Sequence, residues 1–364
     1  MRILVFGHLG QGNIGDELML RPIVTALKQR FPEARLTVAA GRLYDSNFFT
    51  AKQIRRIPRA FRHLLAAFAR HDMLVIAGGT HLHTRSSTSR YTKGVFRHLV
   101  IYTLARFAGL KVWLVGVGIG PFETRIGRLF GRWAVGAADF LSVRDQDSFA
   151  WLRQFGIPEH RFRRCLDPAC YLPLPPRLST AAHLGLSVMS YSRLYPEARK
   201  GDEILVCRFD EVMREWFRAF PNSRISLIAF YSGNDRESDV MCAQRIKAMW
   251  PGDPRVLVVD PRGSSDCCIT RFRHFTHFIA MRYHSQVLAT LFGIPQVVIA
   301  YHRKNFSFAA TSGTRPEDVM SIEDFLAGRA RPAIVRLFNG GVIAPSVPIS
   351  GRWDELLPFR TLNA

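Results

Sequence analysis

The chain has 364 residues, which is long for one compact domain and fits two domains of about 150 to 200 residues each. Hydrophobic residues make up 48%, so both domains can bury a core, and a disordered or fibrous protein is excluded. Lys and Arg outnumber Asp and Glu by 50 to 29, a net charge of +21. Residues 1–172 contain 26 basic and 11 acidic side chains and so carry +15 of it. Such a surface attracts polyanions of any kind.

No basic tail, zinc-binding spacing or aromatic RNA-binding signature points to nucleic acid as the polyanion. The six cysteines form no C-x-x-C pair, and Cys267 and Cys268 are adjacent, which is typical of reduced thiols in the cytosol. The first apolar run, Ile3–Phe6, is too short for a signal peptide, and other apolar runs are strand-sized. We therefore expect a cytoplasmic protein, attached at most to the inner face of the cell membrane.

Apolar runs alternate with helical patterns through the first half of the chain, and glycine-rich turns follow several of the runs. Strands are expected at Ile3–Phe6, Leu36–Ala40, Met73–Ala77, Val112–Val117 and Phe140–Val143, and helices at Asp16–Arg30, Lys52–Arg70, Tyr91–Gly109 and Gln146–Phe155. Continuous apolar strands separated by helices indicate a parallel sheet covered on both faces.

Four prolines within Pro168–Pro176 predict a linker, after which the same pattern restarts. Strands are expected at Leu184–Met189, Ile225–Ala229, Val256–Val259, Phe278–Met281 and Gln296–Ala300, and helices at Phe209–Phe220, Val240–Trp250 and Ser285–Phe292. The sequence thus predicts an α/β protein of two Rossmann-like domains, residues 1–172 and 173–364, facing across a cleft. In such sheets ligands bind beyond the carboxyl ends of the strands.

The turn after the first strand contains Gly12, Asn13 and Gly15, followed by Asp16 at the start of a helix. Glycines let the backbone approach a ligand closely, and a helix N-terminus favours negative charge. The spacing matches neither the dinucleotide fingerprint nor the P-loop. The alternative is that Asp16 simply caps the helix.

Further candidates follow later strands of the first half, namely Gly78, Gly79, Gly118, Gly120 and Arg144. Each glycine could serve only a tight turn, but several at one edge of a sheet favour a binding rim. No His, Cys or Asp cluster has the spacing of a structural metal site, so no metal is predicted.

In the second half, Arg282, His284 and Ser285 follow a strand and open a helix, and Lys304 follows the next strand. A guanidinium binds carboxylate or phosphate through two hydrogen bonds, and an imidazole can donate a proton near neutral pH. The alternatives are that Arg282 is a structural ion-pair partner and that His284 is structural.

Seven short motifs occur in a fixed order along the chain. They are N-x-G-D-E at Asn13–Glu17, G-G-x-x-L at Gly78–Leu82, G-x-G-I-G-P at Gly116–Pro121, S-x-R-D-x-x-S at Ser142–Ser148, D-P-A at Asp167–Ala169, R-x-H at Arg282–His284 and G-I-P…Y…K at Gly293–Lys304. This order resembles the polysaccharide pyruvyl transferase family. The sequence departs from the family in two places. Thr80, His81 and His83 lie where a third glycine and a later acid are usual. Ser190–Arg193 lies where an earlier Asn or Arg is common.

The resemblance implies a fold similar to the glycosyltransferase-B enzymes and an activity that needs no cofactor. Such a transferase moves the enolpyruvyl group of phosphoenolpyruvate onto a sugar of a surface-polysaccharide precursor, often lipid-linked, usually as a cyclic ketal. His284 is then the candidate general acid, with His302 as the next candidate, and Asp16 orients the acceptor hydroxyl or acts as base. The glycine loops, Asn13, Arg144, Arg282, Ser285 and Lys304 would bind substrate. Residues 1–172 would form the acceptor side and residues 173–364 the phosphoenolpyruvate side.

Two other functions remain open, a nucleotide-sugar glycosyltransferase and a non-enzymatic binder of anionic polymers. For membrane contact, the predicted helix Lys52–Arg70 carries Ile57, Phe61, Leu64, Leu65 and Phe68 on one side and five basic residues in its first half. Such a helix can lie on an anionic membrane surface. The alternative is that its apolar stripe packs on the first domain.

Overall fold

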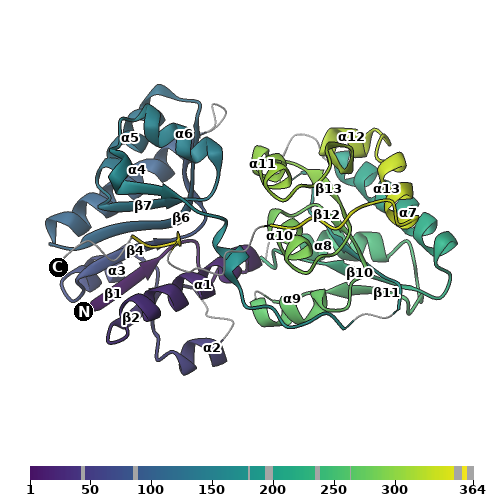
Figure 1. Cartoon of the computed structure of the whole chain (residues 1–364), viewed down its shortest axis with the longest axis horizontal. Coiled ribbons are helices and arrows are strands. Elements are labelled where there is room, and N and C mark those ends of the chain that lie inside the picture. Colours follow the sequence, from purple (N-terminus) through teal and green to yellow (C-terminus); the bar gives the residue numbers. More distant parts are fainter. Residues whose placement is uncertain are drawn as a thin grey trace. The chain divides into compact units, whose positions relative to one another are not determined.

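The computed structural model describes residues 1–41, 46–84, 89–178, 181–192, 200–233, 238–262, 264–347 and 355–358. The chain divides into two compact units (Figure 1). The first unit comprises Met1–Gln11, Asp16–Leu172 and Ser350–Ala364, and the second comprises Gly12–Gly15 and Pro173–Ile349. Each unit is built on its own parallel sheet with helices around it, so the predicted α/β class with two Rossmann-like parts is confirmed.

The first unit contains an eight-stranded sheet among its described residues, with strand order β3-β2-β1-β4-β6-β7-β8 and β5 paired to β6. All of these pairs are parallel. The strands are β1 Arg2–Phe6, β2 Arg35–Ala39, β3 Arg55–Ile57, β4 Met73–Ala77, β5 Thr80–Thr84, β6 Lys111–Phe122, β7 Phe140–Val143 and β8 Phe162–Arg164.

Helices cover both faces of this sheet because successive strand residues point to opposite faces. Leu4 and Phe6 of β1 join one apolar core with α3, α4, α5 and α6, whereas Ile3 and Val5 join another with α1 and α2. Figure 1 shows α4, α5 and α6 on one side of the sheet and α1 and α2 on the other. The helices are α1 Ile14–Arg30, α2 Ser46–Ala51, α3 Phe61–Phe68, α4 Ser89–Phe107, α5 Arg125–Gly136 and α6 Gln146–Gln154.

In its described residues, the second unit contains a six-stranded sheet with strand order β11-β10-β9-β12-β13-β14. Numbered from β9, this order is 3-2-1-4-5-6, the order of the doubly wound Rossmann fold. The strands are β9 His183–Ser187, β10 Arg224–Ile228, β11 Val256–Val259, β12 His277–Ala280, β13 Gln296–Ala300 and β14 Val319–Ser321. The helices are α7 Lys200–Ala219, α8 Asp239–Lys247, α9 Ser265–Phe272, α10 Tyr283–Leu291, α11 Arg303–Thr311, α12 Ile322–Leu326 and α13 Arg331–Phe338.

The helix expected over Lys52–Arg70 is wrong. Arg55–Ile57 instead forms β3, the edge strand beside β2, and only Phe61–Phe68 is helical. Pro58 explains the difference, because a proline excludes the residue before it from helical geometry. Leu64 and Phe68 enter the core, so the short α3 packs on the first unit.

Two segments lie in a different unit from the one expected. The segment Gly12–Gly15 belongs to the second unit, and the C-terminal segment, expected within 173–364, belongs to the first. Leu356 and Leu357 are buried in the core beside α1, and the carbonyl of Leu356 accepts a hydrogen bond from Ser142 Oγ at 2.8 Å. The expected linker is also shorter, since Pro168–Tyr171 forms a buried turn of the first unit. None of the described helices is long and apolar enough to cross a membrane.

Candidate active site

The centre of the second sheet provides the place where a ligand is expected. Strands β9 and β12 are neighbours there, and the strand order reverses between them, which marks the binding position in such folds. Ser187 ends β9, and its Oγ accepts hydrogen bonds from the backbone N–H of Met281 at 2.8 Å and of Arg282 at 3.1 Å. The hydroxyls of Ser187 and Ser285 are 2.6 Å apart. These bonds fix the start of α10 against the end of β9.

Arg282 forms a bidentate ion pair with Asp239, the first residue of α8. Its Nε donates to Asp239 Oδ2 at 2.8 Å, and one Nη donates to Oδ1. Asp239 is fully buried and also accepts a bond from the backbone N–H of Phe230 at 3.0 Å. Burial lowers the pKa of Arg282, but Asp239 and Tyr301 together raise it by more, so the guanidinium stays charged. Arg282 is therefore a structural ion-pair partner, which was the alternative stated for it from the sequence.

Lys304 adds a second cation to the same neighbourhood. Its Nζ lies 5.2 Å from the ring centre of Tyr283 and 5.3 Å from that of Tyr301, which follows β13. Burial raises the pKa of Tyr301, but the positive charges of Lys304 and Arg282, together with a hydrogen bond from Lys304, lower it by more. This net lowering reports a positive electrostatic potential around the ends of β12 and β13. Such a potential favours an anionic ligand.

His284 lies against the segment Gly12–Gly15. A Cβ built on Gly15 would stand 1.9 Å from His284 Nδ1, so only glycine allows the imidazole this position. The segment is held by a hydrogen bond from the N–H of Ile14 to the carbonyl of Phe230, and by one from the N–H of Ser232 to Gly12, both 3.0 Å. Asn13 pairs with Tyr231 as an isolated antiparallel bridge. Gly12, Asn13 and Gly15 therefore join Arg282 and His284 in the second unit.

Asp16 lies in the first unit, in the first turn of α1, and is 7% exposed. Its negative charge raises the pKa of Arg59, although burial lowers that pKa by more. The neighbouring Glu17 accepts a bond from the N–H of Gly10 at 2.7 Å. Glu17 thus closes the turn after β1.

The remaining first-unit candidates are packed inside the protein. Gly78 and Gly79 turn the chain from β4 into β5, and a Cβ on Gly118 or Gly120 would meet Thr80 or Trp151. Arg144 forms a buried ion pair with Asp167 at 2.6 Å and donates to Thr80 Oγ1 at 3.1 Å. These residues hold β5, β6 and β7 together. Among the described residues, no group of three or more His, Cys, Asp and Glu could hold a metal ion.

A cluster of imidazoles lies at the carboxyl end of the first sheet. The rings of His81 and His98 are 5.1 Å apart, and the Tyr102 hydroxyl is 3.2 Å from His98 Nδ1. Burial lowers the pKa of His81 well below its usual range and that of His98 to about 4, and nearby cationic groups lower both further. The Nε2 of His81 is buried and has no hydrogen-bond partner within the described part of the chain. The cluster is uncharged near neutral pH and offers donors and acceptors for hydroxyl groups.

A sequence profile of the polysaccharide pyruvyl transferase family matches residues 13–303. The chain belongs to this family. It is therefore a transferase, and its family implies a sugar of a polysaccharide as acceptor. No curated protein sequence matches the chain significantly.

Solved structures extend the match in fold across nearly the whole polysaccharide pyruvyl transferase chain. The UDP-GlcNAc 2-epimerase from Neisseria meningitidis has a TM-score of 0.63 at 9% identity and covers 98% of this chain and 97% of its own. The S. aureus MnaA–UDP structure has a TM-score of 0.62 at 12% identity, with coverages of 97% and 93%. The Methanocaldococcus jannaschii UDP-GlcNAc 2-epimerase gives 0.60 at 11%, with 93% of each chain covered. At such identities the likeness shows the glycosyltransferase-B-like fold alone.

In this transferase the structure brings Arg282, His284, Ser285 and Lys304 to one sheet edge, together with Gly12–Gly15. Sequence reasoning missed Asp239 and Tyr301 as members of this group. Asp239 lies 43 residues before Arg282, so only the pairing of α8 with the end of β12 places it there. Tyr301 is part of the last motif, but sequence reasoning assigned no role to it, because its contacts with Lys304 and Arg282 are known only from the structure.

Proposed function

We propose that the protein transfers the enolpyruvyl group of phosphoenolpyruvate to a sugar of a surface-polysaccharide precursor and closes it as a cyclic ketal. The observation that carries this proposal is the group of Lys304, Arg282 and His284 at the end of β12 in a chain of this family. Phosphoenolpyruvate bears about three negative charges on a very small molecule, so it requires cations and backbone donors.

Lys304 is the principal binding cation in this proposal. Asp239 neutralises much of the charge of Arg282, whereas no carboxylate is in ion-pair contact with Lys304 among the ion pairs described for the chain. The first N–H groups of α10 add donors for a phosphate or carboxylate oxygen. Arg282 then orients the start of α10 and contributes to the positive potential.

His284 acts as the general acid in this mechanism. It gives a proton to the methylene carbon of phosphoenolpyruvate, and the adjacent carbon becomes oxocarbenium-like. A sugar hydroxyl adds to that carbon and loses its proton, and inorganic phosphate leaves with the electrons of its C–O bond. A second hydroxyl adds to the same carbon and loses its proton, which closes the ketal. The reaction as written consumes no cofactor.

The acceptor sugar is assigned to the first unit. Asp16 orients an acceptor hydroxyl or takes its proton, and the uncharged imidazoles around His81 suit further hydroxyl groups. A precursor carried on a lipid would place the enzyme in the cytoplasm at the inner face of the membrane.

The test is to incubate the protein with phosphoenolpyruvate and candidate lipid-linked sugars. We expect one inorganic phosphate per turnover and a product heavier by one pyruvate minus one water. A nucleotide-sugar glycosyltransferase is the alternative, because the epimerases of similar fold are named for UDP-GlcNAc. Thermal stabilisation by UDP or GDP but not by phosphoenolpyruvate would refute the proposal in favour of that alternative.

A further inference from the structure

Helices α4 and α5 pack side by side in the first unit and leave large apolar side chains on the surface. Phe107 is 86% exposed, Ile126 60% and Trp133 53%. The exposed apolar residues of the two helices are Phe96, Leu104, Phe107, Ile126, Leu129 and Trp133, named here the α4–α5 face. An apolar surface of this extent on a folded protein marks an interaction site.

Ring contacts join part of the α4–α5 face across the two helices. On α5, Ile126, Leu129 and Trp133 are spaced by three and four residues and so share one side of the helix. Phe130 joins the two helices, because its ring lies 5.1 Å from that of Phe96 and 6.3 Å from that of Trp133.

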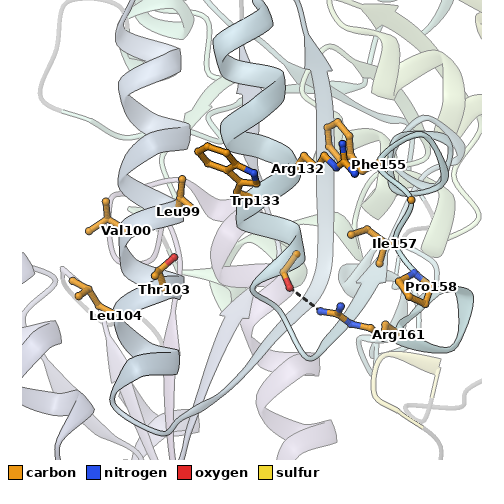
Figure 2. A pocket seen from close by; sticks show the side chains of 12 residues that line it. Leu99, Val100, Thr103, Leu104, Arg132, Trp133, Phe155, Ile157, Pro158 and Arg161 are labelled. Carbon is orange, nitrogen blue, oxygen red and sulfur yellow. Dashed lines mark hydrogen bonds between the residues drawn. The ribbon is translucent and has the colours of Figure 1, made fainter.

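An open hollow of about 1010 Å³ lies beside this surface. Figure 2 shows Leu99 and Thr103 of α4 on one side of the hollow and Trp133 of α5 beside them. Arg161 closes the far side, and its guanidinium donates to the carbonyl of Gly136 at 2.9 Å. Basic and apolar groups therefore meet in one concave surface.

All the Lys, Arg, Asp and Glu side chains in the sequences of α4 and α5 are basic. The sequences of α4 and α5 contain seven Lys or Arg residues, four in α4 and three in α5, and no Asp or Glu. Arg106 pairs with Asp139 just after α5. Arg125, Arg128 and Arg132 are exposed on the same helix as Ile126, Leu129 and Trp133.

We propose that the α4–α5 face binds the surface of an anionic lipid bilayer. The apolar side chains enter the boundary between head groups and acyl chains, and the arginines contact lipid phosphates. Association with a second copy of the chain through a two-fold axis would set one all-basic helix pair against another, which is unfavourable. Aliphatic side chains such as Leu104 and Ile126 give nothing for a nucleic acid to bind. The proposal does not rest on the reaction, because the α4–α5 face consists of exposed side chains, whereas His98 and Tyr102 of α4 belong to the imidazole cluster.

The experiment is sedimentation of the full chain with phosphatidylcholine vesicles that contain graded amounts of phosphatidylglycerol. Binding should rise with the anionic fraction and weaken as salt is added. The double variant Ile126→Glu with Trp133→Glu should bind vesicles about tenfold more weakly. Its circular-dichroism spectrum and thermal unfolding should match those of the parent, which shows that the variant is folded.

The matched control places glutamate at two exposed apolar residues of the second unit, Ile204→Glu with Met249→Glu. This control should bind vesicles as the parent does. A second pair separates charge from apolar contact: Arg125→Gln with Arg132→Gln should weaken binding, and Arg218→Gln with Arg271→Gln should not. Equal binding by both glutamate variants overturns the proposal. A parent that does not bind anionic vesicles overturns it as well. A parent dimer that the first variant alone dissociates, without vesicle binding, overturns it in favour of self-association.

Discussion

Arg282 and Lys304 carry the same formal charge but differ in their surroundings. The guanidinium is held by a fully buried carboxylate, whereas the ammonium of Lys304 lies over two tyrosine rings. A buried ion pair is costly to break, because the remaining charge is left without compensation. The ammonium of Lys304 lies over tyrosine rings and is hydrogen-bonded to Tyr301 instead of forming a buried ion pair, so we expect its replacement to cost little stability.

This difference predicts that one substitution lowers stability and the other weakens substrate binding. Asp239→Asn should lower the free energy of unfolding by about 3 kcal/mol, because Arg282 loses its counter-charge. Lys304→Gln should change it by less than about 0.5 kcal/mol but raise the KM for phosphoenolpyruvate about tenfold. Denaturant unfolding and phosphate-release kinetics measure the two effects. A stable Asp239→Asn variant with a raised KM would instead place that pair in direct substrate binding.

His284→Gln should abolish turnover and leave the fold intact, because the change removes a proton donor while the side chain stays of similar size. We expect kcat to fall by a factor of about 10² to 10⁴. Turnover is followed by phosphate release and folding by thermal unfolding. Near-normal activity would move the acid elsewhere, and His302→Gln is then the next variant to measure.

The imidazole cluster makes stability depend on pH. The pKa of His98 is about 4 in the folded chain, lowered mainly by burial, against about 6.5 when unfolded. The unfolded state therefore binds more protons between these values, so the stabilisation is complete above pH 6.5 and is lost as the pH falls toward 4. From pH 7 to pH 5 this one group should cost about 2 kcal/mol.

The variant His98→Gln should therefore lose less stability than the parent between pH 7 and pH 5, by about 2 kcal/mol. Denaturant unfolding at both pH values measures the difference. His160→Gln is the control, since His160 is exposed. An unchanged pH dependence in His98→Gln would show that folding does not shift the pKa of His98.

At the scale of elements, the short segment Gly12–Gly15 belongs to the second unit and pairs with the chain just after β10. Its backbone bonds to Phe230 and Ser232 place Gly15 against His284. Gly15→Ala should displace the imidazole and reduce kcat, because the new Cβ would overlap Nδ1.

Gly94→Ala in α4 is the matched control for that glycine substitution. No atom lies within 4 Å of its added Cβ, so this change should leave kcat unaltered and stabilise the helix by about 0.5 to 1 kcal/mol. Measurement of kcat and thermal unfolding for both variants decides the matter. An active Gly15→Ala enzyme would mean that the position of His284 does not limit the reaction.

The elements that the sequence predicted best are short, mainly apolar strands. Met73–Ala77, Phe140–Val143 and Gln296–Ala300 are buried throughout and have the expected bounds, and so does the edge strand Val256–Val259. Strand β5 was missed, since Thr80–Thr84 follows two glycines and contains Leu82 as its only apolar residue. Helix α5 was missed because Arg125–Gly136 contains three glycines, which are poor helix formers.

The candidate site also contains residues that local sequence patterns predict and residues that only tertiary packing brings together. Arg282, His284 and Ser285 are neighbours in sequence and follow a strand, so their shared position was predictable. Asp239 depends on a contact across 43 residues, and the placement of Gly12–Gly15 depends on backbone pairing with a distant strand end. Local patterns predict neither, because both arise from tertiary packing.

At the scale of the whole molecule, the C-terminal segment contributes to the core of the first unit. Leu356 is fully buried there beside Leu357. Leu356→Ala should lower the free energy of unfolding by about 2 to 5 kcal/mol. The expected loss applies to the first unit, so stabilisation by phosphoenolpyruvate, which we assign to the second, should persist. Loss of that stabilisation at temperatures where the variant is folded would contradict this assignment.

The division of the chain also governs how the enzyme can be cut into pieces. The polypeptide passes from one unit to the other four times, after residues 11, 15, 172 and 349. No single scission therefore releases either unit whole, although residue 172 looks like a natural boundary. A fragment that begins at Pro173 lacks the tetrapeptide that Gly15 belongs to and carries a tail that belongs to the other half. Separately produced halves should thus be inactive alone and regain activity on mixing, as complementary fragments of one interwoven fold.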